Sequence, residues 1–186
     1  EIIFLDRDRV EVKFLNKMKE SSKPSNIELA ICLVKKNPME IILQKATELG
    51  VSRITPIISE RTEVKELNYE RAQKIVIEAT EQSNQLNPPE VTKVIKLKDF
   101  LEKLDSGSKF LFADVNSQNN LQKKDVDGDA LKTILIGPEG DFSPGERESI
   151  LAKANTTSFS ISKNILRSDT AVISAISLVN FINNLH

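Results

Sequence analysis

Short apolar runs alternate along the chain with longer segments in which apolar residues recur every three or four positions. The runs, rich in β-branched residues, predict buried strands, and the helical spacing predicts amphipathic helices between them. We expect strands at 2–5, 10–15, 27–34, 54–58, 91–95, 109–113, 133–136 and 157–161. We expect helices at 38–49, 68–86, about 99–104, from 143 onward and at 171–182, with a polar loop at 116–129. Strands separated by helices predict an α/β fold, a mostly parallel sheet with helices on both faces.

The first 20 residues differ from the rest. Their two strands are joined by a charged turn at 6–9, and a lone two-stranded hairpin is marginally stable in water. We interpret residues 1–20 as the remnant of a truncated N-terminal domain. Residues 21–26, which include serines and Pro24, are predicted to be a linker, and residues 27–186 are predicted to form the main domain.

A glycine-rich turn follows the strand at 133–136, in the segment ILIGPEGDFS at 134–143. Three of the six glycines fall at 137, 140 and 145. Glycine reaches backbone conformations that a side chain forbids and lets the backbone approach a bound group closely. The turn lacks both GxGxxG and GxxxxGK[ST], so its ligand is not a polyphosphate. The alternative is a tight strand-to-helix connection with no chemistry.

Two loops of this kind are expected at one edge of the sheet. Ser143 and Glu146 form an S-x-x-E capping box with Pro144 in the first turn, which predicts that a helix follows the glycine turn at once. The second loop, SKNILRSDT at 162–170, also lies between a strand and an apolar helix. Parallel sheets bind ligands at the carboxyl ends of their strands, so the two loops can form one site.

Composition narrows the class of protein. The 186 residues are 39% hydrophobic and 28% charged, as in a globular domain. The single cysteine, Cys32, lies in an apolar run, so we expect no disulfide framework, no metal site and a reducing cytoplasm. The longest apolar tract, 171–182, is too short to span a membrane and is interrupted by polar residues.

Net charge gives a mixed indication about nucleic acid. A value of −1 argues against broad nonspecific binding, which depends on neutralising phosphates. A local basic patch is one interpretation of six lysines, and ordinary solvation of the surface is the other: Lys93, Lys96, Lys98, Lys103, Lys123 and Lys124.

Four segments in matched order carry a family resemblance: KATELGVSRITPIISERT at 45–62, EATEQS at 78–83, ILIGPEGDFSPGE at 134–146 and ILRSDTAVISAISL at 165–178. They resemble the RsmE family of 16S ribosomal RNA uridine-N3 methyltransferases, of the SPOUT class. The resemblance implies a C-terminal deep trefoil knot that binds S-adenosylmethionine, and a homodimer. It also implies an N-terminal PUA-like β-barrel for RNA, of which residues 1–20 are the remnant.

Two positions depart from the family pattern. The chain has Ile161-Ser162 where the family usually has Leu-Gly, which removes a glycine from the predicted cofactor loop. It has Ser168-Asp169 where the family has Thr-Glu, which preserves the hydroxyl and the carboxylate.

The implied reaction places demands on the site. Methyl transfer needs the acceptor held in line with the methyl group. Uridine N3 must lose a proton, and the negative charge shared onto O2 and O4 must be stabilised. Arg167 is the predicted catalytic residue, because guanidinium is always charged and offers planar donors. The alternative for Arg167 is a salt bridge to Asp169 or a cap on the next helix. No side chain stands out as a general base, and His186 is terminal.

The resemblance also implies the binding residues. The predicted S-adenosylmethionine contacts, through backbone groups and an apolar adenine slot, are Leu135, Ile136, Gly137, Pro138, Glu139, Gly140, Ile161, Leu166, Ser168, Thr170 and Ala171. The predicted substrate contacts are Glu60, Arg61, Glu81, Gln82 and Ser83. The alternatives are that the apolar members are core residues and that the charged ones form a solvated ion-pair face.

The leading function is S-adenosylmethionine-dependent methylation of uridine N3 in 16S rRNA. Another SPOUT enzyme, such as a ribose 2′-O methyltransferase, is the runner-up, which the ILRSDTA and SER motifs disfavour. A non-enzymatic RNA-binding module is third, and failure to bind the cofactor would favour it. The homodimer has its own support in the helix at 171–182, whose apolar residues exceed one buried face: Ala171, Val172, Ile176, Val179 and Phe181.

Overall fold

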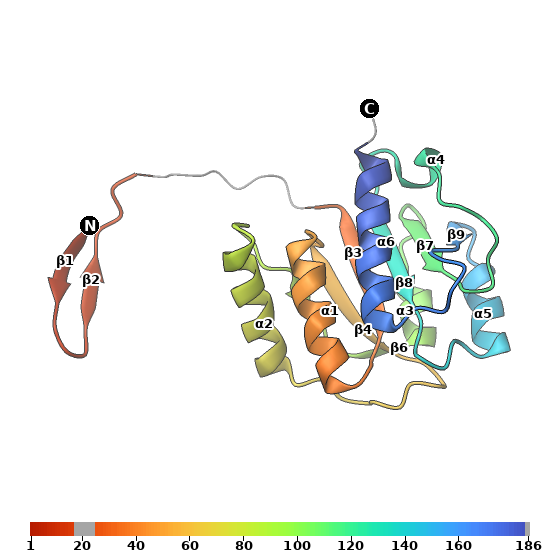
Figure 1. Cartoon of the computed structure of the whole chain (residues 1–186), viewed down its shortest axis with the longest axis horizontal. Helices are drawn as coiled ribbons and strands as arrows, with labels where there is room; N and C mark the ends of the chain where they lie inside the picture. The colour runs from red at the N-terminus through yellow and green to blue at the C-terminus, as the bar shows by residue number, and fades with distance from the viewer. Residues whose placement is uncertain (17–24, 185–186) are drawn as a thin grey trace.

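A seven-stranded sheet forms the centre of the computed structural model, which describes residues 1–16 and 25–184 (Figure 1). Every neighbouring pair in this sheet is parallel, in the order β5-β4-β3-β8-β7-β9, with β6 also beside β4. The strands are β3 Ile27–Cys32, β4 Arg53–Ile58, β5 Glu90–Val91, β6 Ile95–Lys96, β7 Lys109–Ala113, β8 Lys132–Ile136 and β9 Thr156–Phe159. The helices are α1 Lys36–Glu48, α2 Tyr69–Gln82, α3 Leu97–Lys103, α4 Lys123–Val126, α5 Pro144–Leu151 and α6 Ser168–Asn183.

Helices cover both faces of the sheet, as predicted. In β8, Ile134 and Ile136 join the core beneath α1, α2 and α6, whereas Leu135 between them joins the core beneath α3 and α5. Figure 1 shows α2, α1 and α6 side by side on one face. Strands buried on both faces read in sequence as continuous apolar runs, which explains why the strand prediction succeeded here. Cys32 is a core residue, and burial raises its pKa to about 12.

The path of the chain after β9 brings the two predicted loops together. β8 lies in the middle of the sheet between β3 and β7, and β9 lies at the edge beyond β7. The next helix, α6, packs against α1 and β8 instead of staying beside β9. Residues 160–167 therefore return from the sheet edge past the end of β7 towards the glycine turn that follows β8.

Several boundaries differ from the prediction. Helix α2 ends at Gln82 and not at 86, because Ser83 caps it and Asn84 takes a left-handed φ of 55°, well before the prolines at 88 and 89. The strand predicted at 91–95 is two short strands that both pair with β4. The predicted loop at 116–129 contains the single turn α4. Helix α6 begins at Ser168, three residues before the predicted start.

The N-terminal segment forms an antiparallel hairpin of β1 Ile2–Leu5 and β2 Val10–Val12, shorter in its second strand than the predicted 10–15. Its apolar side chains, including Phe4 and Leu5, are exposed. Most of the predicted linker, 21–24, and His186 lie outside the described residues. Over the described ranges, none of the helices has the length and apolar character needed to cross a membrane.

Candidate active site

A cleft of about 330 Å³ opens at the carboxyl ends of β7, β8 and β9. Its walls are the segment after β7, the glycine turn after β8, and the loop from β9 into the first turn of α6. Nine of the eleven predicted cofactor residues line it: Ile136, Gly137, Pro138, Glu139, Gly140, Ile161, Leu166, Ser168 and Ala171. The structure thus brings together two loops that α5 and β9 separate in the sequence.

Two predicted cofactor residues are not part of the cleft lining. Leu135 lies within β8, paired with Ala30 and Phe112, and its side chain is buried beneath α3 and α5. Alternation along the strand turns Leu135 away from the face on which α6 packs. Thr170 is exposed on α6. The Leu135 side chain is therefore a core residue, and the predicted contact of its backbone with the cofactor stays a prediction.

The sequence prediction missed the wall that follows β7. Ala113, Asp114 and Val115 line the cleft there, and Asp141, Ser160, Ser162, Asn164 and Ile165 complete it. The strand at 109–113 was predicted, but its position next to β8 was not. Placing β7 beside β8 would have assigned the residues after Ala113 to the same edge.

The unusual backbone conformation of the glycine turn falls on Asp141. Its φ is 59°, and its N–H donates to the Pro138 carbonyl at 3.0 Å. Among the described glycines, only Gly50 and Gly128 have positive φ, so the expectation of special conformations at 137, 140 and 145 is wrong. Gly137 is needed for space instead, because a Cβ there would lie 3.0 Å from the Phe142 ring.

Gly140 has more room than Gly137. A Cβ at this position would approach only Arg61, at 3.8 Å, which is an ordinary contact distance. Packing within the protein therefore does not require a glycine at this position.

Helix α5 begins immediately after the turn with the predicted capping box. The Ser143 hydroxyl accepts the Glu146 N–H at 3.3 Å, and the Glu146 carboxylate accepts the Ser143 N–H at 3.1 Å. This reciprocal pair fixes where the glycine turn ends and the helix starts.

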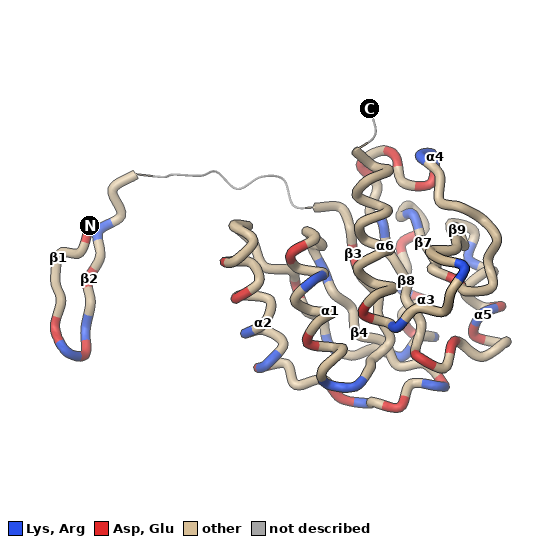
Figure 2. Tube along the Cα trace, in the orientation of Figure 1, with Lys and Arg blue, Asp and Glu red and all other residues tan. Residues whose placement is uncertain are grey.

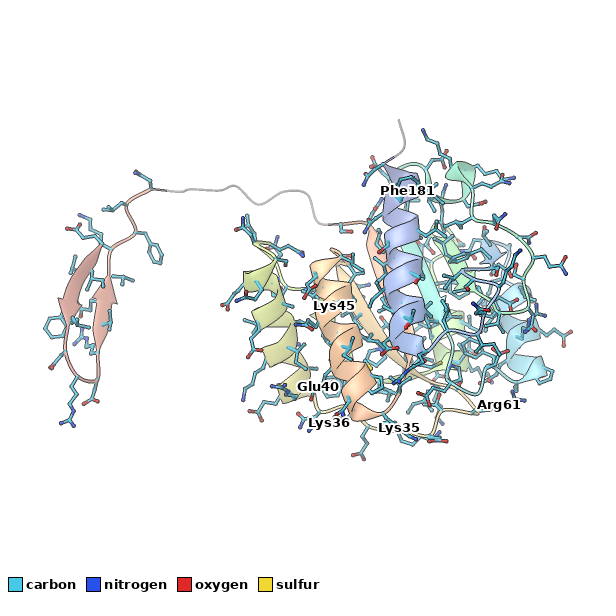
Figure 3. All side chains as sticks on the ribbon, viewed as in Figure 1. Lys35, Lys36, Glu40, Lys45, Arg61 and Phe181 are labelled. Carbon is cyan, nitrogen blue, oxygen red and sulfur yellow. The ribbon has the colours of Figure 1, made fainter. Side chains whose placement is uncertain are left out.

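The loop after β4, which carries the SER motif at 59–61, lies against the glycine turn. The Arg61 guanidinium donates to the Gly140 carbonyl at 2.9 Å, and the Glu60 N–H donates to the Glu146 carboxylate at 2.8 Å. Figure 3 shows Arg61 at the lower edge of the molecule, the edge at which Lys35 marks the start of α1. Of the predicted substrate residues, Arg61 thus contacts a wall of the cleft and Glu60 contacts the helix that follows this wall.

The other three predicted substrate residues, Glu81, Gln82 and Ser83, lie elsewhere. They form the C-terminal end of α2, where Gln85 donates to the carbonyls of Thr47 and Glu48 at the end of α1. A helix that follows a parallel strand runs back along the sheet, so its C-terminal end lies at the opposite edge from the strand's carboxyl end. The prediction that these residues share the cleft is wrong within one chain.

Arg167 occupies the N-cap position of α6, between two residues that line the cleft. Its neighbours Leu166 and Ser168 line the cleft, whereas its own side chain is 72% exposed and makes no capping hydrogen bond. Its guanidinium forms an ion pair with Asp169 at 3.7 Å. An exposed pair of this length is weak, so Asp169 leaves the guanidinium available to another anion.

An ion pair between a buried carboxylate and a half-buried guanidinium supports the wall after β7. Asp114 accepts from the Arg147 guanidinium of α5 at 2.6 Å, from the Ser158 hydroxyl at 3.2 Å and from the Asn116 N–H at 2.9 Å. Burial acts to raise the pKa of Asp114, but these hydrogen bonds outweigh it and hold the pKa below its usual value. The carboxylate is therefore ionised at neutral pH.

The loop after β9 does not need the glycine that the family usually has at position 162. The Ser162 hydroxyl accepts the Asn164 N–H at 3.0 Å, and the Ser162 carbonyl accepts from the Ser160 hydroxyl at 3.1 Å. The φ of Ser162 is not positive. The loop closes on itself through these short-range bonds.

Over residues 1–16 and 25–184, the surface charge forms no single basic face. The predicted lysine patch is divided, because Lys123 and Lys124 belong to α4 beside α6, whereas Lys98 and Lys103 belong to α3 on the other face. Figure 2 shows acidic and basic residues interspersed along the edge that carries the cleft. Residues 1–16 and 25–184 contain no group of three or more metal-ligating side chains placed to hold an ion.

Comparison with known proteins identifies relatives along nearly the whole chain. The family profile described as RNA methyltransferase domain matches residues 21–180. The ribosomal RNA small subunit methyltransferase E of Rickettsia conorii is 32% identical, covering 97% of this chain and 74% of that protein.

Solved structures agree with the sequence match. A probable rRNA methyltransferase from Porphyromonas gingivalis superposes with a TM-score of 0.88 at 28% identity, over 98% of this chain and 78% of that one. A ribosomal RNA small subunit methyltransferase E from Neisseria gonorrhoeae bound to S-adenosyl methionine superposes with a TM-score of 0.80 at 30% identity, over 90% and 70%. By sequence and by fold, this chain belongs to the family of RNA methyltransferases.

Proposed function

We propose that this protein uses S-adenosylmethionine to methylate N3 of uridine in 16S, small-subunit ribosomal RNA. The observation that carries the proposal is the cleft between the glycine turn and the loop at 160–168. It collects nine of the eleven residues expected to contact the cofactor, in a chain whose relatives include a methyltransferase E bound to S-adenosyl methionine.

The residues of the cleft fit this cofactor. Ile136, Ile161, Leu166 and Ala171 supply apolar surface for an adenine ring. The same lining carries the acidic side chains of Glu139 and Asp141, whose charge suits a cationic sulfonium. Close backbone approach is possible at Gly140, which has no side chain on the turn. Bound S-adenosylmethionine supplies an electrophilic methyl group to an acceptor held in line with it.

Arg167 is the residue that we assign to the acceptor. Its guanidinium is exposed, and the residue lies between two residues that line the cleft. A uridine ring lying over the mouth of the cleft would present O2 or O4 to this guanidinium, which stabilises the negative charge that develops as N3 loses its proton. Glu60 and Arg61 adjoin the glycine turn from the other side and are placed to orient the nucleotide.

Three further assignments belong to this proposal. The return of residues 160–167 past the glycine turn supports the deep trefoil knot that the family implies. Residues 1–20 are assigned to an RNA-binding PUA-like domain, because residues 2–12 form a hairpin whose apolar side chains are exposed. The action on ribosomal RNA places the enzyme in the cytoplasm.

A homodimer is also part of the proposal, but fewer apolar residues are exposed to support it than the sequence predicted. Val172, Ile176 and Val179 are fully buried within the chain, so they are not surplus apolar surface. Phe181 remains 65% exposed on the same helix, and Ile165 is exposed in the preceding loop. These two side chains supply the apolar surface that a second copy would cover.

Titration of the protein with S-adenosylmethionine in a calorimeter, followed by methyl transfer to unmodified small subunits or 16S rRNA, tests the function. We expect saturable binding and formation of N3-methyluridine. Binding with methylation of a ribose hydroxyl would instead favour a 2′-O methyltransferase. Absence of cofactor binding would favour a non-enzymatic RNA-binding protein.

A further inference from the structure

The Glu146 side chain joins two loops that the sequence places far apart. One of its carboxylate oxygens accepts the Ser143 N–H, which closes the cap of α5 directly after the glycine turn. The other oxygen accepts the N–H of Glu60, from the loop that follows β4, at 2.8 Å. A capping residue needs only the first of these bonds. The second bond connects the SER loop to the end of the glycine turn.

Hydrogen bonds at the base of the SER loop fix its conformation, so a bond to Glu60 also fixes the position of its neighbour Arg61. The base of the loop is closed by the Ser59 N–H, which donates to the Thr62 hydroxyl at 2.9 Å, and by the Thr62 N–H, which donates to the Ser59 carbonyl. Ser59 and Thr62 are both buried, whereas Glu60 and Arg61 between them are exposed. A second tie runs from the Arg61 guanidinium to the Gly140 carbonyl. The two exposed residues are therefore held against the end of the glycine turn and the first turn of α5.

We propose that Glu146 is a positioning residue that fixes the position of the SER loop relative to the glycine turn. It thereby sets the distance between the bound nucleotide and the transferable methyl group. The inference rests on the proposed function, in which the SER loop orients the nucleotide and the turn holds the cofactor. Glu146 lies outside the cleft lining and acts through the two loops. The rate of methyl transfer depends on the placement of the nucleotide relative to the methyl group, because misplacement by about 1 Å can cost on the order of 100-fold in rate.

A carboxylate is the group that this position requires. Its two oxygens both accept, so one side chain serves an N–H from each loop. A glutamine of the same shape has one oxygen and one NH2, and it must present the NH2 to one of the two backbone donors. Glu146→Gln therefore breaks one tie while changing the volume very little.

Steady-state kinetics with the whole chain test the role. We expect Glu146→Gln to lower kcat by about 10- to 100-fold, the scale of lost orientation, with little change in S-adenosylmethionine affinity or in KM for the RNA. Glu148→Gln, an exposed acid two residues along the same helix, removes the same charge and should leave kcat unchanged. An unchanged kcat in Glu146→Gln would overturn the proposal.

Ser143→Ala separates positioning from helix capping. It removes the hydroxyl half of the capping box but leaves both oxygens of Glu146 and the Glu60 N–H in place. We expect this variant to lose some thermal stability and to keep a kcat close to that of the wild type. If Ser143→Ala lowers kcat as much as Glu146→Gln does, the side chain is only a cap and the proposal is wrong.

Amide hydrogen exchange at Glu60 gives a readout that does not require turnover. Addition of S-adenosylmethionine should slow exchange of this N–H in the wild type and in Ser143→Ala, but not in Glu146→Gln. Equal slowing in all three proteins would show that the Glu146 bond does not link the loops. A wild type that binds the cofactor and shows this coupling, yet methylates no uridine, would count against the proposed function and leave the link between the loops standing.

Discussion

The Arg167 side chain is exposed and permanently charged, and the residue lies between two residues that line the cleft. Substitution of Arg167 can therefore distinguish a role in catalysis from a role in cofactor binding. If its guanidinium stabilises charge that develops only during the reaction, its removal acts mainly on the transition state. Arg167→Ala should lower the methylation rate by about 100- to 1,000-fold, the usual scale for one charge-stabilising donor. Arg167→Lys should recover only part of the rate, because a point charge cannot reproduce a planar fork.

Calorimetric affinity for S-adenosylmethionine is the control for Arg167. The affinity should be nearly the same in the wild type and in Arg167→Ala. A loss of affinity that parallels the loss of rate would mean that Arg167 shapes the loop before α6, and the catalytic role would be wrong.

Asp114 is a second residue whose charge can be tested, through the pH dependence of stability. Its pKa is lower in the folded chain than in the unfolded chain, where it is about 3.9. The ionised carboxylate therefore stabilises the fold at neutral pH, and this contribution is lost as the pH falls through the lower folded-state pKa. Asp114→Asn should be less stable than the wild type by about 1–3 kcal/mol at pH 7.

Urea denaturation between pH 7 and pH 2 measures this effect. The difference in unfolding free energy between the wild type and Asp114→Asn should shrink as the solution becomes acidic. A difference that is the same at both ends of the range would show that the carboxylate charge does not stabilise the fold.

Within the glycine turn, we expect opposite effects from substitutions at two of the glycines. A Cβ at Gly137 would lie 3.0 Å from the Phe142 ring, so Gly137→Ala should destabilise the fold by about 1–3 kcal/mol through overpacking. A Cβ at Gly140 would approach only Arg61, at 3.8 Å. Gly140→Val should therefore keep the fold, whereas the bulk that it adds to a wall of the cleft should strongly weaken S-adenosylmethionine binding.

Thermal melts and calorimetry distinguish the two glycines. We expect a lowered Tm for Gly137→Ala and a near-normal Tm with poor cofactor binding for Gly140→Val. Normal affinity in a well-folded Gly140→Val protein would exclude this turn from the cofactor site.

The elements themselves show which features the sequence could predict. Continuous apolar strands, the capping box at Ser143 and the order of strands and helices depend on local chemistry. They were predicted correctly, except for α4 and the division of the strand at 91–95 into two. The neighbours of each strand depend on long-range pairing, so the placement of Asp114 beside the glycine turn was missed. Glu81 to Ser83 were misplaced because the motif gave no information on which end of α2 lies at which edge of the sheet.

Backbone conformation was the least predictable feature of the site. The glycines drew attention to the turn, but its left-handed residue is Asp141, whose own side chain accepts the Phe142 N–H at 2.8 Å. Aspartate tolerates this conformation better than most side chains. Residue type alone therefore could not locate the strained position.

For the whole molecule, α6 connects the cleft to the proposed dimer. Its first turn lines the cofactor cleft, and Phe181 is exposed near its other end (Figure 3). Phe181→Glu places a charge on the surface that a second copy would cover, so it should dissociate the dimer without unfolding the chain. Sedimentation should give a dimer mass for the wild type and a monomer mass for the variant. A wild type that is monomeric at all concentrations would contradict the dimer.

The central claim is that this protein methylates N3 of uridine in small-subunit rRNA. Nucleoside mass spectrometry of 16S rRNA tests it most directly, in a strain that lacks the gene and in the same strain supplied with the wild type or with Arg167→Ala. The account predicts that N3-methyluridine is absent without the gene, returns with the wild type and stays nearly absent with Arg167→Ala. Unchanged N3-methyluridine in the strain without the gene, or loss of a different methylated nucleoside, would contradict it.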